Sequence, residues 1–421
     1  MRRAVITGVG VVAPGAVGRD RFWSLLTSGR TATRPVTLFD AAGHRSRIAA
    51  EVDFDAGAHG FTAADTERLD RAAQFALVAA REAVADSGLD GGGDPLRRGV
   101  SLGSAAGCTT SLATQYALLS DCGRNWAVDH TPASAWLYDY FVPSSLAAAV
   151  ARECGAQGQV SLLSSGCTSG LDAVGHGGEL IREGSADVVV AGATEAPISP
   201  IIMACFDRLR LTSRRNDEPD SASRPFDRSR DGFVLGEGAA VVVLEELEHA
   251  RRRGAAPYAE LAGFATHSSA HHMTGLRPGG QELARAISAA LDGARLNPVD
   301  IDYVSAHGAG TRNNDRHETH ALKAGLGEHA HRIPVSSIKS MIGHALGAAG
   351  ALDVAASALA IRHGTVPPTA NLHEPDPACD LDYTPLFARR HPTAAVLAVA
   401  SGFGGFHSAT VLARPRLRET P

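Results

Sequence analysis

One cysteine and two histidines stand in similar, glycine-containing surroundings. Cys167 lies in SSGCTSG, His307 in SAHGAGT and His344 in SSIKSMIGHALG, and a short apolar run precedes each segment. This arrangement is typical of a turn that leaves a strand, where glycine permits tight bending and close approach of a substrate. A thiolate exchanges thioesters readily, and imidazoles can assist proton movement near neutral pH. The pattern predicts a thiol-based acyl-transfer enzyme with Cys167 as its nucleophile.

The position of Cys167 at the start of a predicted helix supplies only part of its activation. The helix dipole stabilises an anion there by about 0.3–1 kcal/mol, occasionally ~2 kcal/mol. At ~1.36 kcal/mol per pKa unit, it would lower a thiol pKa of ~8.5 by about one unit, so further activation is expected from a histidine. The other five cysteines, at positions 108, 122, 154, 205 and 379, form no CxxC pair and are interpreted as structural.

Lysine is scarce in this chain. Only Lys323 and Lys339 occur among its 40 basic residues, and the others are arginine. Lys339 lies in the His344 segment, and a lysine kept in such a composition suggests a need for its compact, titratable charge. A zinc site built from Cys167 and the two histidines is disfavoured, because the short ligand spacings of zinc sites are missing.

The elements that could position these residues alternate between strands and helices. Such alternation predicts an α/β fold in layers, with buried sheets. We expect strands at residues 4–7, 99–102, 160–163, 188–191, 239–244, 303–306, 334–337, 395–398 and 409–412. We expect helices at residues 65–85, 167–183, 281–290 and 345–362.

A weak internal repeat suggests a duplicated fold. Residues 160–184 and 335–364 each run through an apolar strand, a serine-containing turn and an apolar helix to a final glycine. Because single cores stop growing near ~250–300 residues, a chain of 421 residues favours two subdomains. We expect an N-terminal half, residues 1–253, with the cysteine, and a C-terminal half, residues 254–421, with the histidines and Lys339. The reactive residues would meet between the halves.

Composition narrows the class of protein. The net charge of −5 gives no reason to expect a nucleic-acid partner. No apolar run reaches the ~18 residues of a membrane span. The start, MRRAVITGVGVVAPG, is broken by glycine and proline, so we interpret it as a first strand and turn rather than a signal peptide. A reducing cytoplasm is therefore the expected location.

The reactive segments resemble the β-ketoacyl synthases of the thiolase superfamily. The cysteine turn, His-Gly-x-Gly-Thr and Ser-Ile-Lys-x-x-x-Gly-His occur in family order, and similarity runs from RAVITG near the start to GFGGF near the end. The stretches DYFVPSS, GCTSGLD, HMTGL and NDRHET are most similar to the ketosynthase alpha subunit of bacterial type II polyketide synthases. The resemblance implies a thiolase-like, duplicated fold of αβαβα layers.

The resemblance also implies a decarboxylative Claisen condensation. Cys167 would take the growing acyl chain as a thioester from an acyl carrier protein, with its own N–H and that of Phe403 as the oxyanion hole. Malonyl carrier protein would then enter, and His307 and His344 would stabilise the enolate formed as CO2 leaves. The carbanion would attack the thioester on Cys167 and form a carbon–carbon bond. No metal or organic cofactor is expected, because the carrier's phosphopantetheine holds the substrates.

Matching family positions give roles to supporting residues. Lys339 would orient His307 through a network with Glu318. Thr311 matches a position that contacts pantetheine. Phe403, besides its N–H, matches a gating residue beside the cysteine.

Further matches concern partners. Arg68 and Arg210 match positions that dock the acidic carrier protein. The natural partner would be a ketosynthase beta subunit, the chain-length factor, in a heterodimer, with a homodimer as the alternative. The chain departs from the family pattern at Ala309 and Ala345, where hydroxyl residues are common, and at His407, where glutamine is usual in aromatic-polyketide relatives.

Four other classes of protein combine a reactive cysteine or this fold with part of the pattern. A non-catalytic chain-length-factor-like subunit would lack the nucleophile, yet Cys167, His307 and His344 are all present. A thiolase would use a second cysteine as its base. A fatty-acid condensing enzyme shares the motifs and stays open as the main alternative. A papain-like protease is excluded because its cysteine turn and its order of histidine and asparagine are absent.

Overall fold

The computed structural model describes residues 2–89, 93–125 and 128–415. Within these residues, one large sheet runs through the molecule. Its main strands are β1 (Ala4–Ala13), β5 (Arg98–Gly103), β6 (Val160–Leu163), β7 (Val188–Glu195), β9 (Gly238–Glu246), β10 (Ala259–Ser268), β11 (Tyr303–Ser305), β12 (Val335–Ser336), β15 (Ala395–Gly402) and β16 (Phe406–Ala413). Their order is β6-β5-β7-β9-β1 in one half and β10-β16-β15-β11-β12 in the other. The halves join where β1 pairs antiparallel with β10.

Six longer helices complete two copies of one topology. They are α3 (Arg71–Ser87), α6 (Ser145–Cys154), α7 (Ser169–Arg182), α10 (Gln281–Ala294), α11 (Arg312–Leu326) and α13 (Ala349–His363). The first copy runs β1-α3-β5-α6-β6-α7-β7-β9 and the second β10-α10-β11-α11-β12-α13-β15-β16. The two segments that resembled each other in the sequence therefore lie at equivalent places, in β6-α7 and in β12-α13.

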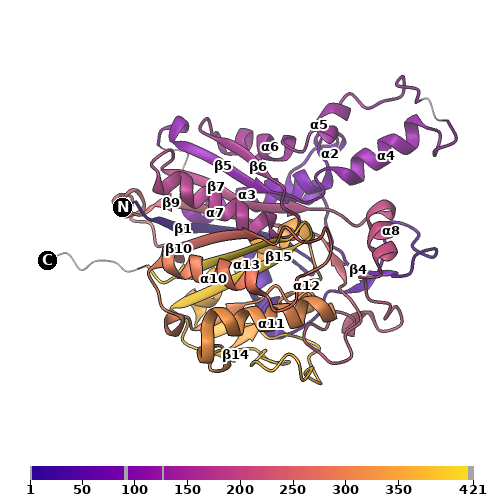
Figure 1. Ribbon diagram of the computed structural model, residues 1–421. Helices are drawn as coiled ribbons and strands as arrows, with labels where there is room; N and C mark the ends of the chain where they lie inside the picture. The colour runs from indigo at the N-terminus through magenta and orange to yellow at the C-terminus, as the bar shows by residue number, and fades with distance from the viewer. Residues whose placement is uncertain (1, 90–92, 126–127, 416–421) are drawn as a thin grey trace.

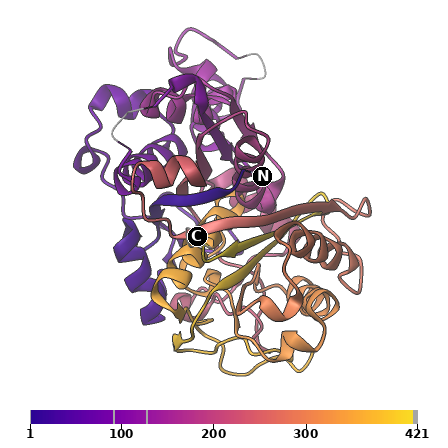
Figure 2. The same ribbon diagram turned by 90° about the vertical axis from the view of Figure 1, so that its left-hand side faces the viewer.

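These elements stack as five layers, α, β, α, β and α. Helices α3 and α6 cover the outer face of the first half-sheet, and α10 and α11 cover that of the second. Helices α7 and α13 pack against each other and against strands of both halves, so they form the middle layer. Figure 2 shows the N-terminal half above the C-terminal half, with the C-terminal strands fanning below β1. The thiolase-like layered fold expected from the sequence is confirmed (Figure 1).

Shorter elements decorate the two halves. The helices are α1 (Arg19–Ser28), α2 (Ala63–Arg68), α4 (Thr109–Leu119), α5 (Leu137–Phe141), α8 (Pro200–Leu209), α9 (Leu247–Arg252) and α12 (Lys339–Ile342). The strands are β2 (Ala16–Val17), β3 (Arg34–Pro35), β4 (Ile48–Ala50), β8 (Leu235–Gly236), β13 (Thr365–Val366) and β14 (Arg389–Arg390). Among the described residues, no helix combines the length and apolarity that crossing a bilayer requires.

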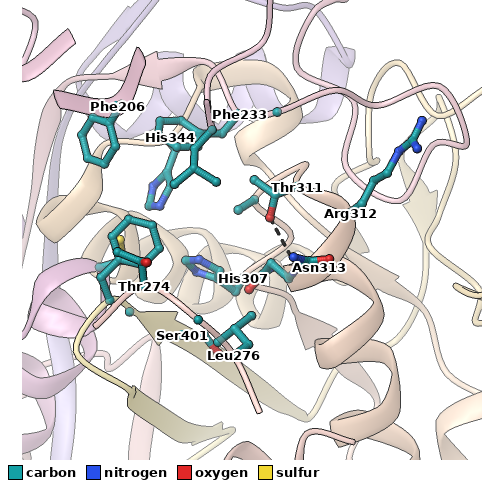
Figure 3. Close-up of a pocket in the computed structure, with 18 of the residues that line it drawn as sticks. Phe206, Phe233, Thr274, Leu276, His307, Thr311, Arg312, Asn313, His344 and Ser401 are labelled. Atoms are coloured by element: carbon teal, nitrogen blue, oxygen red, sulfur yellow. Dashed lines mark hydrogen bonds between the residues drawn. The ribbon is translucent and has the colours of Figure 1, made fainter. Parts of the chain in front are cut away.

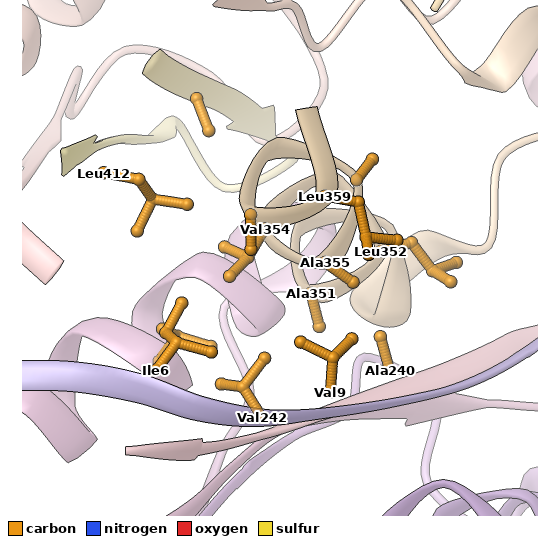
Figure 4. Packing of buried hydrophobic residues seen from close by; sticks show 14 of the residues in the cluster. Ile6, Val9, Ala240, Val242, Ala351, Leu352, Val354, Ala355, Leu359 and Leu412 are labelled. Carbon is orange, nitrogen blue, oxygen red and sulfur yellow. The ribbon is translucent and has the colours of Figure 1, made fainter. Parts of the chain in front are cut away.

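The middle layer explains the alanine-rich sequence of α13. From Ala349 to Ile361 every residue of this helix is buried, since it is enclosed on all sides. Small side chains such as Ala351 and Ala355 let it approach the strands, where Ile6, Val9 and Val242 fill the space beneath (Figure 4). A helix that is apolar all round is typical of such an enclosed position. The core thus fixes α13, and with it the turn that precedes the helix.

The expected strands all occur, and most extend beyond the predicted ends. The helix predicted over residues 65–85 is wrong as a single element, because it breaks at Leu69 and Asp70 into α2 and α3. The Asp70 side chain accepts a hydrogen bond from the Ala72 N–H (2.8 Å) and so caps the N-terminus of α3. The helix predicted from residue 167 begins at Ser169, behind a 3₁₀ turn. Among the main elements, strand β10 and helices α6 and α11 were not predicted.

The proposed division at residue 253 falls between α9 and β10. The sheet and the middle helix layer continue across it, so the two halves share one structural framework. We keep residues 1–253 and 254–421 as sequence halves rather than as separate bodies.

Candidate active site

The reactive residues of both halves line one pocket. It has a volume of about 420 Å³, and Cys167, His307 and His344 all contribute to its wall. Aromatic side chains, including Phe206, Phe233 and Phe403, line it as well. Figure 3 shows His307 and His344 on neighbouring parts of the wall, with Phe206 and Phe233 beside His344. The structure thus brings together the residues that the sequence placed in separate turns.

A buried carboxylate fixes the turn that carries Cys167. This residue lies in the 3₁₀ turn η3 (Gly166–Thr168), between β6 and α7. Asp172, one turn into α7, accepts hydrogen bonds from the hydroxyls of Ser165, Thr168 (2.8 Å) and Ser408 (2.5 Å). Because Ser408 belongs to β16, this network ties the nucleophile's turn to the C-terminal half.

The Cys167 thiol is less acidic than the sequence suggested. Burial raises its pKa to about 12, although the charge of Lys339 and the N–H groups of Phe403 and Cys167 itself lower it. The prediction of a net lowering is therefore wrong, because it counted the local turn and not the apolar surroundings contributed by distant segments. The free thiol is neutral at pH 7. The two N–H groups that lower the thiol pKa, those of Phe403 and Cys167, are the ones expected to form the oxyanion hole.

His307 and His344 form a closely spaced, neutral pair. Their ring centroids lie 5.2 Å apart with the planes at 83°. Burial, followed by the charge of Lys339, lowers the pKa of His307 well below its ordinary value and that of His344 to about 3. The Nδ1 atom of each ring has no hydrogen-bond partner among the described residues. Each neutral imidazole carries one N–H, so the pair can present two donors without net charge.

Glu318 holds the turn of His307 through the backbone. Its two carboxylate oxygens accept hydrogen bonds from the N–H groups of His307 (2.6 Å) and Gly308 (2.8 Å). Burial raises the pKa of Glu318 to about 8. Gly308 has a φ of 39°, and a Cβ there would meet the Ser337 Cβ at 2.5 Å, so the turn requires glycine.

Lys339 pairs with a residue that the sequence did not single out. Its Nζ lies 2.7 Å from Oδ2 of Asp353, and both side chains are buried. The expected network from Lys339 through Glu318 is not a hydrogen-bonded one. Lys339 influences Glu318 by charge, lowering its pKa, while Glu318 bonds the backbone of His307. A lone aspartate inside the apolar helix α13 was the available signal for Asp353.

Of the remaining residues predicted to belong to the site, three line the pocket and one does not. Thr311, Phe403 and Arg210 line the pocket. Thr311 also caps α11 by accepting the N–H of Asn314 (3.4 Å). Arg68 is not among the lining residues, and it lies 3.6 Å from Asp65, one turn earlier.

Several lining residues were missed by sequence reasoning. Arg230 is completely buried and bridges Asp315 (2.9 Å) and Asp376 (3.0 Å) beneath the pocket wall. Behind Ser401, the substituted position His407 is buried and its Nδ1 lies 3.0 Å from the serine hydroxyl. Arginine within a polar loop and serine within a strand gave no distinctive signal. Within the described residues, no group of three or more His, Cys, Asp or Glu side chains has an arrangement that could hold a metal ion.

Comparison with known proteins gives this pocket a family context. Residues 1–250 match the β-ketoacyl synthase N-terminal domain and residues 258–373 match the β-ketoacyl synthase C-terminal domain. The chain is 62% identical to the tetracenomycin polyketide synthase ketoacyl synthase alpha subunit of Streptomyces glaucescens, covering 99% of this chain and 98% of that one.

Solved structures agree with this similarity. One is a type II polyketide synthase acyl carrier protein in complex with its ketosynthase bound to the hexaketide, with a TM-score of 0.92, 40% identity, and coverage of 98% of this chain and 100% of that chain. Another is the ishigamide ketosynthase/chain length factor, with a TM-score of 0.90, 34% identity, and coverage of 98% and 99%. With its thiol and histidine pocket at the centre of the matched fold, the chain belongs to the β-ketoacyl synthase family.

Proposed function

We propose that this chain is the catalytic ketosynthase of a bacterial type II polyketide synthase and performs decarboxylative condensation on carrier-bound chains. The observation that carries the proposal is the meeting of one thiol and two neutral imidazoles in a single, largely apolar pocket. Its similarity to the tetracenomycin ketoacyl synthase alpha subunit supports the polyketide pathway over fatty-acid elongation.

The first half-reaction is transfer of an acyl chain to Cys167. The sulfur attacks the thioester carbonyl of the acyl carrier, the new carbon–sulfur bond forms, and the pantetheine sulfur leaves and takes the thiol proton. The N–H groups of Cys167 and Phe403 lower the pKa of the thiol, which supports the proposal that they also stabilise the oxyanion that develops beside the sulfur. Since the free thiol is neutral, its proton moves as the bond forms rather than before substrate arrives.

The second half-reaction uses the histidine pair. The malonyl group loses CO2, and its two bonding electrons pass to an enolate whose oxygen needs donors. Neutral His307 and His344 can each donate one N–H to that oxygen. Their low pKa values matter because both rings stay uncharged at pH 7 and remain weak proton donors, so the enolate is stabilised and not quenched. The carbanion then attacks the acyl group on Cys167, and the cysteine sulfur leaves.

Lys339 supplies charge rather than contact. It lowers the pKa of the Cys167 thiol and of both histidines. A fixed positive charge near the sulfur favours its departure as a thiolate in the second half-reaction. The pair with Asp353 holds this ammonium in place within a buried site.

We propose that two arginines dock the carrier protein: Arg210, which lines the pocket, and Arg68, which lies outside its lining. Arg210 is exposed and lines the pocket, which supports a role for its positive charge in binding an acidic carrier. The Arg210→Glu variant is expected to raise KM for the acyl carrier severalfold while kcat stays near the wild-type value. Arg208→Glu serves as the control, because Arg208 is an exposed arginine at the end of α8, two residues before Arg210, and is not among the pocket-lining residues. Equal KM changes in the two variants would remove Arg210 from the docking surface.

An apolar surface on the N-terminal half supports a dimeric assembly. Tyr116, Tyr138 and Phe141, on α4 and α5, are 55%, 75% and 67% exposed. Strand β6, which follows these helices in the sequence, forms one edge of the large sheet, and such an edge can pair with another strand. We propose a ketosynthase beta subunit, the chain-length factor, as the occupant, and a second copy of this chain as the alternative.

A reconstitution assay tests the function. The chain, a beta subunit and malonyl carrier protein are expected to yield poly-β-keto products. Condensation of saturated acyl chains by a homodimer, independent of a beta subunit, would favour fatty-acid elongation instead.

We further propose that the pocket works without a bound cofactor, with substrates held on the carrier's phosphopantetheine. The six cysteines are free thiols, and a thiol nucleophile suits the reducing cytoplasm.

A further inference from the structure

Glu195, at the end of β7, is a completely buried carboxylate that the reaction described above does not use. Within the described residues, no Lys, Arg or His side chain lies within ion-pair distance of it. A buried carboxylate without a cation is costly unless hydrogen bonds satisfy its oxygens. The bonds that satisfy Glu195 therefore define what this residue holds.

Four donors converge on the Glu195 carboxylate. Three come from the turn after β5: the Ser104 hydroxyl (2.9 Å) and the N–H groups of Ala105 (2.6 Å) and Ala106 (3.0 Å). The fourth is the N–H of Gly347 (3.0 Å), in the 3₁₀ turn η7 (Leu346–Ala348) that leads into α13. Glu195 thus joins strand ends of the N-terminal half to a turn of the C-terminal half.

The turn that Glu195 holds is the one that carries His344. Gly347 follows His344 by three residues, and its approach to the carboxylate is so close that a Cβ there would lie 2.5 Å from the Glu195 Oε2. Gly170, just after the Cys167 turn, packs against the same segment, since a Cβ at this position would lie 3.0 Å from the Gly347 carbonyl oxygen. The turn of the nucleophile therefore packs against the turn of His344, and the latter is hydrogen-bonded to Glu195.

We infer that Glu195 is a positioning residue for the condensing reaction, one that sets His344 against Cys167 by bonding the Gly347 turn. The inference rests on the proposed function and adds a residue to it. Glu195 also acts on the nucleophile itself, because its charge raises the pKa of the Cys167 thiol. Removing the charge of Glu195 is therefore expected to slow the reaction that needs a well-placed His344 and, at the same time, to speed alkylation of Cys167.

The test compares Glu195→Gln with Glu245→Gln in the full chain. Glu245 is an equally buried carboxylate at the far end of β9, where it pairs with Arg253 and His249. CO2 release from malonyl carrier protein is measured without an acyl chain, together with alkylation of Cys167 by iodoacetamide at pH 8. A third readout is hydrogen exchange of residues 343–350.

Glu195→Gln is expected to lower kcat for CO2 release about tenfold or more, with little change in KM, because small displacements of a catalytic group are costly. Alkylation of Cys167 is expected to become faster and exchange in residues 343–350 to rise. Glu245→Gln is expected to change none of the three. Ser104→Ala, which removes one of the four donors, is expected to lie between wild type and Glu195→Gln, and it stands in if that variant does not fold.

An unchanged kcat in folded Glu195→Gln or Ser104→Ala would overturn the inference. So would equal losses of kcat in Glu195→Gln and Glu245→Gln, since these would report only the loss of a buried carboxylate. If the wild-type chain releases no CO2, the proposed function fails instead. Exchange and alkylation then still decide whether Glu195 holds the Gly347 turn.

Discussion

Replacing Lys339 by methionine separates the structural role of this lysine from its chemical one. At the observed 2.7 Å between Nζ and Oδ2 of Asp353, the attraction is about 6 kcal/mol for an effective dielectric constant of ~20. Desolvation of both charges offsets much of it. Removing one partner leaves Asp353 buried and unpaired, and such losses cost about 3–5 kcal/mol. We therefore expect Lys339→Met to lose about 4 kcal/mol of stability at pH 7.

The loss is expected to shrink in acid. Burial raises the pKa of Asp353 to about 6 in the native protein, so the wild type gains stability from proton uptake only below pH 6. Without Lys339 the pKa of Asp353 rises further. Folding of the variant is then accompanied by proton uptake at every pH from 7 to 5, so its stability increases over this whole range. At ~1.36 kcal/mol per unit, the variant recovers about 1 kcal/mol relative to wild type by pH 5. Urea unfolding followed by circular dichroism at both pH values measures this.

The double variant Lys339→Met/Asp353→Asn removes the unpaired charge. Its stability is expected to return to within about 1–2 kcal/mol of wild type, because neutral groups replace a buried pair. Alkylation of Cys167 is expected to be slower than in wild type in both variants. The charge of Lys339 lowers the pKa of the thiol, and both variants lack this charge. A loss below about 1 kcal/mol for the single variant at pH 7 would refute the energetic reasoning. Wild-type alkylation in the double variant would refute the chemical role.

Two further predictions concern buried charges in the pocket wall. Arg230→Met leaves Asp315 without its cation in a buried site and is expected to cost about 3–5 kcal/mol, measured by urea unfolding; a loss near zero would show that the bridge to Asp315 and Asp376 contributes nothing. His344→Gln tests the pKa of about 3. Because the unfolded histidine binds a proton below ~6.5 and the folded one does not, wild type is expected to lose about 2 kcal/mol relative to the variant between pH 7 and 5. A stability difference that stays constant with pH would contradict the neutral state of His344.

The sequence alone predicted a thiol and two histidines in one site, because each of these side chains follows a strand and stands in a short turn. Cys167, His307 and His344 were singled out by their glycine-containing turns after strands, and the resemblance to β-ketoacyl synthases then implied their roles in a condensation. The duplicated βα units gave a second, independent indication, and both units lie at equivalent places in the fold.

Long-range partners were beyond local patterns. Asp353 is one of many buried positions in α13, and only packing of the middle layer shows that it faces Lys339. Glu195 and Gly347 are 152 residues apart. The acidity of Cys167 was misjudged for the same reason, since burial by distant segments outweighs the local turn. The break between α2 and α3 escaped notice because the Asp70 cap competes with an otherwise continuous apolar pattern.

Acyl transfer from carrier to chain tests the central claim most directly. Wild type and Cys167→Ala are incubated with an acyl carrier protein, and intact mass with peptide fragmentation locates the transferred group. We predict that wild type gains one acyl group on Cys167 and none on Cys154, the preceding cysteine in the sequence. The alanine variant is predicted to gain none, while it still releases CO2 from malonyl carrier protein through His307 and His344. Acylation of the variant, or condensation by it, would contradict a mechanism that holds the growing chain on Cys167.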